Sequence, residues 1–175
     1  QAVWRQEAKK WSHLQHLRFS MITGTKTDRV RAITRPADVY LVNYENVKWL
    51  FQILEHYYAS RIDLLPFDML VLDESTKMKR PDTKRMAAIL PYLKFFRYRV
   101  GLTGTPATNG LEDIWGQFLC VDSGLRLGVD YSAFIADHFE SGGFGGYKYT
   151  PKPDSEQKIY HRISDIIQQL RSEDY

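Results

Sequence analysis

The chain has 175 residues, of which 43% are hydrophobic and 26% are charged. These proportions are ordinary for a globular domain that can bury a sizeable core. The single cysteine, Cys120, excludes an internal disulfide and fits a reducing compartment. We find no signal peptide and no apolar run long enough to span a membrane, so we expect no membrane partner.

The net charge of +3 is unevenly distributed along the chain. Residues 1–35 hold eight Lys and Arg against Glu7 and Asp28, which gives +6 there and leaves −3 for the remainder. A basic N-terminal part permits a phosphate-backbone partner such as a nucleic acid. A set of solvated helix faces would give the same pattern, so charge alone does not decide between the two.

Hydrophobic periodicity predicts alternating helices and strands in the first part of the chain. In order, they are a helix over 3–11, a strand over 17–22, a helix over 27–33, a strand over 39–42 and a helix over 46–60. Two sets of aromatic side chains fall on apolar faces of these helices: Trp4 and Trp11, and Trp49, Tyr57 and Tyr58. We expect both sets to pack in the core rather than to bind a ligand.

The second part contains two short apolar runs that end abruptly in polar residues, which is typical of buried parallel strands. We predict these strands over 69–72 and 100–102, with a helix over 83–94 between them. The elements predicted after them are a helix over 111–121, a helix over 131–139, a flexible loop over 142–146 and a helix over 155–171 capped by Ser155. The whole pattern predicts an α/β fold with a mostly parallel sheet.

Polar side chains follow both predicted buried strands. Asp73 and Glu74 come directly after the first strand, and Thr103 and Thr105 follow the second. In open α/β sheets, chemistry takes place just beyond the carboxyl ends of the strands, so we expect these side chains to meet at one rim. Between the two threonines, Gly104 is expected to permit a backbone shape that other residues resist.

A pair of adjacent carboxylates at such a rim suits nucleotide hydrolysis. Asp73 could hold Mg²⁺ through water molecules, since this ion prefers oxygen ligands and dehydrates reluctantly. Glu74 could orient and deprotonate the attacking water. Taken alone, the pair could also be a solvated strand end, and residues 103–105 could be a simple turn.

Together, these segments resemble the Swi/Snf-type branch of superfamily 2 helicases and translocases, most of all its phage and prokaryotic members. The match to motif III of that family runs through Thr103, Gly104, Thr105, Pro106, Asn109, Leu111, Glu112, Asp113, Ile114 and Trp115. Asp73 and Glu74 are similar to motif II, the Walker B box. The resemblance implies a three-layer RecA-like domain of the P-loop NTPase type that uses ATP and Mg²⁺.

The resemblance also implies roles for individual residues. Asp73 and Glu74 would be the catalytic pair, with Asp73 as the metal ligand. The segment Thr103-Gly104-Thr105 would couple the ATP site to DNA. The cell compartment implied is the cytoplasm of a bacterium or of a phage-infected host.

Further segments resemble parts of the family that lie near DNA. The residues from Trp4 to Trp11 resemble the segment after motif Ia. Asn43 and Tyr44 follow the second predicted strand and resemble motif Ib, which touches DNA phosphates in the family, although Asn43 could equally serve as a turn or cap residue. Lys79 lies in a basic loop after motif II, where a Lys is common in the family and where a solvated loop is the alternative.

One family motif does not occur in this sequence, namely the phosphate-binding loop Gly-x-x-x-x-Gly-Lys-Ser/Thr. The resemblance therefore predicts that residues 1–175 are an incomplete first lobe, with a helical extension over 123–175, and that a second RecA-like lobe is its partner in a longer protein. Many relatives have Ala or Gly and then His after the Asp-Glu pair, where this chain has Ser75 and Thr76. The contact that joins motifs II and III is therefore not predictable from the family pattern.

Two functions of different classes remain open at this point. The first is a partial motor lobe of an ATP-dependent DNA translocase or helicase, inactive in hydrolysis by itself. The second is a catalytically silent nucleic-acid-binding or interaction module with the same fold. An RNA helicase is disfavoured, because those usually carry Ser-Ala-Thr at the position of Thr103-Gly104-Thr105. Since no recognition helix or zinc finger is visible, DNA binding is expected to be independent of sequence.

Overall fold

The computed structural model describes residues 2–58, 66–107, 110–142 and 148–170. The chain divides into two compact units, Gln1–Ala59 and Ser60–Tyr175. Each unit contains a parallel pair of strands with helices around it. The α/β class and the parallel strand pairing predicted from the sequence are therefore confirmed.

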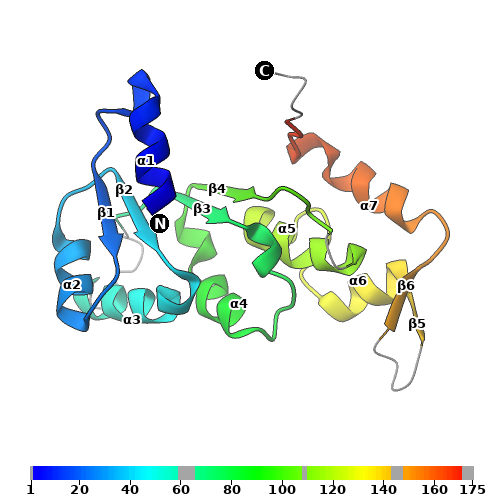
Figure 1. Cartoon of the computed structure of the whole chain (residues 1–175). Coiled ribbons are helices and arrows are strands. Elements are labelled where there is room, and N and C mark those ends of the chain that lie inside the picture. The colour runs from blue at the N-terminus through cyan, green and yellow to red at the C-terminus, as the bar shows by residue number, and fades with distance from the viewer. Residues whose placement is uncertain (1, 59–65, 108–109, 143–147, 171–175) are drawn as a thin grey trace. The chain divides into compact units, whose positions relative to one another are not determined.

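The first unit is built on the parallel strands β1 (Phe19–Ile22) and β2 (Val39–Val42), which lie side by side in Figure 1. Helix α2 (Lys26–Thr34) connects them. Its start is fixed by a capping box, in which Thr25 and Asp28 each accept a hydrogen bond from the other's backbone N–H. Helices α1 (Ala2–Lys10) and α3 (Val47–Tyr58) complete the unit.

The buried face of α3 does not contain the aromatic residues predicted to pack there, which corrects that prediction. Helix α3 buries one face, made of Val47, Leu50, Phe51 and Leu54. Those residues recur at the spacing of one helix face, so Trp49 is left on the flank, half-buried, and Tyr57 is 53% exposed. Tyr58, the last residue of the helix, is half-buried.

The two tryptophans near the N-terminus are likewise not core residues. Trp4 is 39% exposed and Trp11 is 55% exposed. Ala8 is the buried residue of α1, and the helix ends at Lys10, so Trp11 lies in the turn that follows. The helix therefore buries a small side chain, and both large rings stay exposed to solvent.

The second unit is built on the parallel strands β3 (Met69–Asp73) and β4 (Tyr98–Leu102). The sequence predicts that both strands are buried, but among the described residues of this unit only one face of the strand pair is covered. On that face, Val121 of α5 lies against Gly101, and Leu72 is 3% exposed. The opposite face carries five exposed apolar residues: Met69, Val71, Tyr98, Val100 and Leu102.

The helix predicted over 83–94 is two elements. Helix α4 (Lys84–Ile89) ends before Pro91, and a 3-10 helix continues from Leu90 to Phe95. Proline has no backbone N–H and its ring crowds the preceding turn, so the α-helical hydrogen bonding stops there.

The chain then continues through helices α5 (Ile114–Asp122) and α6 (Tyr131–His138), with a short 3-10 turn before α5. Strands β5 (Phe139–Gly142) and β6 (Lys148–Pro151) pair antiparallel, a hairpin that the sequence did not predict. Of the predicted flexible loop, Gly142 belongs to β5, and residues 143–146 lie outside the described part of the chain.

The last helix, α7 (Ser155–Ile163), is shorter than predicted and is followed by a 3-10 turn over Ser164–Ile166. Ser155 is not its cap, since Asp154 occupies that position with a positive φ of 62° and makes no side-chain cap hydrogen bond. Ser155 is instead buried in the first turn.

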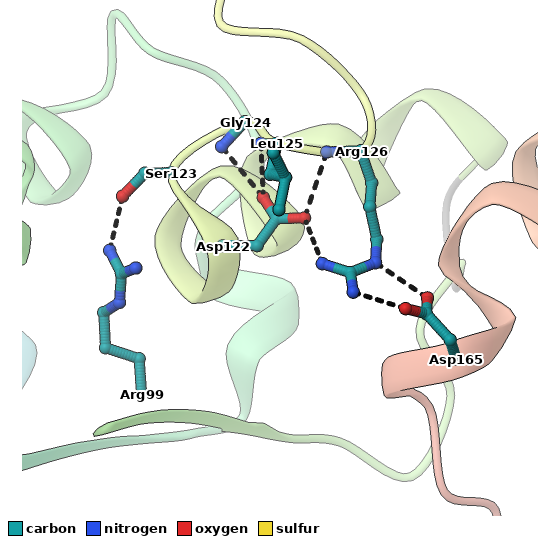
Figure 2. Close-up of polar contacts among 7 residues, drawn as sticks. All are labelled: Arg99, Asp122, Ser123, Gly124, Leu125, Arg126 and Asp165. Atoms are coloured by element: carbon teal, nitrogen blue, oxygen red, sulfur yellow. Dashed lines mark hydrogen bonds and ion pairs between the residues drawn. The ribbon is translucent and has the colours of Figure 1, made fainter. Parts of the chain in front are cut away.

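The turn after α7 is tied to the loop after α5 by an arginine held between two aspartates (Figure 2). Asp122 accepts hydrogen bonds from the backbone N–H groups of Gly124 and Leu125 at 2.8 and 3.1 Å. It also accepts one from the Arg126 guanidinium at 3.2 Å, and that guanidinium makes two further bonds to Asp165, at 2.8 and 2.5 Å. This arrangement joins segments 39 residues apart in the sequence.

Candidate functional site

The carboxyl ends of β3 and β4 bring the predicted chemical residues side by side. The strand register pairs Asp73 with Leu102, so Glu74 and Thr103 are the next residues along the two neighbouring strands. The side chains of Asp73 and Glu74 are exposed, and Thr103 is half-buried. Thr105 lies two residues further on, and its backbone N–H donates a hydrogen bond to Thr103 Oγ1 at 3.3 Å.

Glu74 has an unusual backbone conformation. Its φ and ψ are 55° and 56°, in the left-handed region that non-glycine residues rarely adopt. Such a conformation costs about 1 kcal/mol or more and is found disproportionately at functional sites. The Glu74 carbonyl accepts a hydrogen bond from the Lys77 N–H at 2.9 Å, which begins a 3-10 turn over Ser75–Lys77. The chain therefore turns sharply at the second carboxylate.

Gly104 does not show the backbone shape expected from the sequence. Its φ is not in the positive region, and a Cβ added there would meet no atom within 4 Å. Neither backbone conformation nor crowding requires glycine at this position in the structure.

A buried polar side chain that the sequence did not single out lies behind the strand ends. Gln117 of α5 is 4% exposed. Its Oε1 accepts a hydrogen bond from Ser75 Oγ at 2.8 Å, and its Nε2 donates to the carbonyl oxygens of Pro106 and Asp113 at 2.6 and 3.2 Å. Ser75 and Gln117 are 42 residues apart, so no local pattern could have revealed the pair.

Lys79 is engaged within the second unit. Its ammonium lies 2.6 Å from a carboxylate oxygen of Asp113, whose side chain is only 10% exposed. The same loop lies close to α5 at Gly116, where an added Cβ would come within 2.3 Å of the Lys79 carbonyl oxygen. Glycine at position 116 is therefore required for this helix to approach the loop after the Asp-Glu pair.

In the first unit, Asn43 and Tyr44 lie at the carboxyl end of β2, where a 3-10 turn over Tyr44–Asn46 begins. Asn43 is exposed, and its side chain makes no capping hydrogen bond. The simple capping role considered for Asn43 is therefore not the one that it has in this structure.

A basic hollow of about 310 Å³ lies at the opposite, amino edge of β1. Its lining includes four cationic side chains: Arg5, Lys9, Arg18 and Arg35. The Arg18 guanidinium donates two hydrogen bonds to Asp38, at 3.0 and 2.9 Å, and the Arg18 backbone N–H donates a third, at 2.8 Å. These bonds keep the pKa of the Asp38 carboxyl well below its usual range. The other three cations make no ion pair with any residue that the structure describes.

Among the described residues, neither the cysteine nor a cluster of metal ligands offers an alternative active site. Burial raises the pKa of the Cys120 thiol to about 12, so this side chain is not a nucleophile at neutral pH. Among the described residues, no group of three or more His, Cys, Asp or Glu side chains could hold a metal ion by itself. Mg²⁺ needs no such cage, because one or two carboxylates, water and substrate phosphates usually hold it, so an exposed Asp73 fits that ion.

No helix in the described part of the chain has the length and apolar character needed to cross a membrane.

The family model of the SNF2-related domain matches residues 1–127. Putative protein p41 of Acyrthosiphon pisum secondary endosymbiont phage 1 is 36% identical over 184 residues, which is 100% of this chain and 38% of that protein. The DNA repair and recombination protein RAD54-like of Drosophila yakuba is 26% identical over 172 residues, 94% of this chain and 20% of that protein. The chain thus spans less than half the length of these relatives.

The Sulfolobus solfataricus SWI2/SNF2 ATPase core in complex with dsDNA is a similar solved structure. The TM-score is 0.63 at 24% sequence identity, covering 95% of this chain and 31% of that chain. At this identity the likeness establishes the fold, and the RecA-like type predicted from the sequence is confirmed.

Proposed function

The chain belongs to the SNF2-related domain family, and we propose that it forms part of the ATP-hydrolysing lobe of a DNA translocase or helicase. One observation carries the proposal. Glu74 holds a strained left-handed backbone at the end of β3, in register with the end of β4 that leads into Thr103. Strain of this kind persists where the surrounding structure fixes a functional geometry.

The two carboxylates divide the chemistry between them. Asp73, at the last position of β3, would hold the Mg²⁺ that accompanies ATP, mostly through water. Glu74 would orient the attacking water and take its proton, a role worth roughly 10²–10⁴-fold in rate. Mg²⁺ would supply charge neutralisation at the phosphates when ATP is bound. The strand ends at Asp73 and the backbone turns at Glu74, so the two carboxylates need not occupy equivalent positions along the strand.

Thr103, Gly104 and Thr105 would couple DNA binding to hydrolysis. A hydroxyl cannot replace a carboxylate as base or main metal ligand at neutral pH, but it can orient a carboxylate or a water. The support is their position at the strand end beside Asp73 and Glu74.

DNA would be held through its phosphates, without reading of sequence. Asn43 and Tyr44 are proposed contacts, supported by their place at the carboxyl end of β2 and by the exposure of Asn43. Lys79 is also proposed, although its ammonium pairs with Asp113, so a phosphate would have to compete with that carboxylate. The net charge of +6 over residues 1–35 supplies the general attraction.

The phosphate-binding loop and a second RecA-like lobe are proposed to come from other parts of a longer protein of the phage or prokaryotic branch. The support is that the sequence contains no Gly-x-x-x-x-Gly-Lys-Ser/Thr motif and that the relatives are much longer than the matched region. Since that loop and its lysine cradle the phosphates, residues 1–175 alone should not turn over ATP.

The test is steady-state release of phosphate from ATP, with and without duplex DNA, by the natural protein at full length and by residues 1–175. We expect DNA-stimulated turnover, on the order of 1–10³ s⁻¹, from the full-length protein only. If the full-length protein binds DNA and hydrolyses no ATP, the chain is a silent binding module and the proposal is wrong. Turnover by residues 1–175 alone would contradict the requirement for outside residues.

A further inference from the structure

The buried amide of Gln117 connects the two segments that the proposed function assigns to hydrolysis and to coupling. On one side it bonds to Ser75, the residue directly after Glu74. On the other side it bonds to the carbonyl of Pro106, the residue directly after Thr105. The amide is therefore one hydrogen bond away from each segment.

The orientation of this amide is fixed by chemistry. The carbonyl oxygens of Pro106 and Asp113 can only accept hydrogen bonds, so both must face the NH₂ group of Gln117. The amide oxygen is then left to face the Ser75 hydroxyl, which donates to it. Both amide hydrogens and the amide oxygen are used, as a buried amide requires.

The backbone around the amide is shaped to keep these contacts close. Gly101 of β4 makes room for Ser75, because an added Cβ would lie 3.2 Å from the Ser75 Cβ. Gly116, next to Gln117, lets α5 approach the loop after Ser75–Lys77. Ser75 and Gln117 are 3% and 4% exposed, so solvent does not compete for their hydrogen bond.

We propose that Gln117 is the positioning residue that fixes the 103–106 segment relative to Asp73 and Glu74. A displacement of Pro106 would pull on its hydrogen bond to the Gln117 amide. Because the same amide is bonded to Ser75, the displacement would reach the turn at Glu74. The Ser75–Gln117–Pro106 contact supplies the connection between the two segments. The inference rests on the proposed function, since it specifies how that site responds to DNA.

The substitution that tests this inference is Gln117→Leu, which keeps the approximate volume and removes the three hydrogen bonds. In the natural full-length protein, we expect the ratio of hydrolysis rates with and without DNA to fall roughly tenfold, a size typical of coupling between sites. The KM for ATP and the Kd for DNA should stay within about twofold, because Gln117 is not proposed to touch either ligand. Ser75→Ala should lower the same ratio by a smaller factor, since it removes one hydrogen bond of the three.

Cys120→Ala is the matched control. Cys120 is buried on the same helix, and its sulfur faces Met86 rather than Ser75. The control should lower the unfolding temperature and leave the DNA stimulation per folded molecule unchanged. If Gln117→Leu also leaves that stimulation unchanged, Gln117 is only a packing residue and the inference is overturned.

A second variant, Gln117→Glu, should show a pH-dependent response that a residue serving only in packing would not show. Gln117→Glu keeps the shape but places a carboxylate oxygen against the carbonyls of Pro106 and Asp113, which repel it. Protonation of that buried carboxyl restores one donor, so lowering the pH should recover part of the lost DNA stimulation relative to the parent protein. Absence of any recovery, in a variant that remains folded, would count against the inference.

Hydrogen exchange separates failure of this inference from failure of the proposed function. In Gln117→Leu the backbone amides of residues 103–105 and 107 should exchange faster than in the parent, whereas Cys120→Ala should leave them unchanged. This result does not depend on ATP hydrolysis. If the parent protein shows no DNA-stimulated hydrolysis, the proposed function fails, and exchange still decides whether Gln117 holds the segment in place.

Discussion

The two units use the same local architecture for different kinds of polar site. Each has a parallel strand pair with polar residues beyond its carboxyl ends. In the first unit Asn43 and the cations of the basic hollow, which lies at the amino edge of β1, are exposed. In the second unit Ser75, Asp113 and Gln117, which lie behind the exposed Asp73 and Glu74, are buried and hydrogen-bonded. Exposed cations suit a mobile, salt-dependent partner such as a phosphate backbone, and a buried, fully bonded network suits fixed geometry for chemistry. The units therefore differ in how firmly their polar groups are held.

The largest effect is expected where the second unit depends on a close backbone approach. In Gly116→Ala the added Cβ would lie only 2.3 Å from the Lys79 carbonyl oxygen, so α5 or the loop that contains Lys79 must move. Since backbone atoms cannot yield as a flexible side chain can, we expect a loss of about 3 kcal/mol or more in unfolding free energy. The measurement is denaturant unfolding followed by circular dichroism.

Gly142→Ala is the control for this change, because a Cβ there would meet no atom of the described residues within 4 Å. Its unfolding free energy should stay within about 0.5 kcal/mol of the parent. A Gly116→Ala protein as stable as this control would show that the second unit is less tightly packed than its contacts indicate.

A smaller effect is expected from the exposed cations of the first unit. Replacing Arg5, Lys9 and Arg35 by Gln removes the three cations of the basic hollow that have no ion pair with a described residue. If DNA phosphates reach the hollow, the slope of log affinity against log salt should become shallower by about 0.9 for each phosphate that is no longer neutralised. Fluorescence anisotropy on unrelated duplexes, between about 50 and 200 mM salt, measures this slope.

A second triple variant with the same change in charge distinguishes DNA binding at the hollow from general electrostatic attraction to the first unit. Lys26, Arg31 and Lys48 are exposed cations of the first unit that do not line the hollow. If their replacement by Gln changes the slope as much, the hollow has no special part in DNA binding. If neither variant changes it, the contrast drawn between the two units is wrong. A marked preference for one duplex sequence would contradict binding through phosphates.

The smallest effect is expected on the pH dependence of stability in the second unit. His138 is 6% exposed, and its Nδ1 has no hydrogen-bond partner among the described residues. Burial, together with nearby Arg162, lowers the pKa of His138 below its usual value. The folded state favours the neutral imidazole of His138. Its contribution to the unfolding free energy is therefore present above about pH 6.5 and is lost as the pH falls through the lowered pKa. We expect the unfolding free energy to fall by under about 1 kcal/mol between pH 7.5 and pH 5.5.

Thermal unfolding of His138→Gln and of His161→Gln at both pH values checks this expectation. His161 is exposed, so its replacement should leave the pH dependence unchanged. His138→Gln should flatten it. Equal pH dependence in both variants would assign the effect to other groups.

The sequence predicted what depends on local pattern. The strand ends at Asp73 and Leu102 follow from short apolar runs, and most helices follow from apolar spacing. Burial of individual faces depends on which elements pack together, so the exposed faces of Trp11 and Val71 were not predictable. The Ser75–Gln117 contact spans 42 residues, so local spacing could not predict it.

The most direct test of the proposed mechanism is hydrolysis by the Glu74→Gln form of the natural full-length protein. Glutamine keeps the size of the side chain but cannot take a proton from water at neutral pH. We predict normal ATP and DNA affinity with hydrolysis lowered roughly 10²-fold or more, whereas Asp73→Ala should also weaken binding of Mg²⁺ with ATP. The measurement is single-turnover phosphate release at saturating ATP and DNA. Hydrolysis by Glu74→Gln at the parent rate would show that the strained residue at the end of β3 is not the base, and would contradict the proposed mechanism.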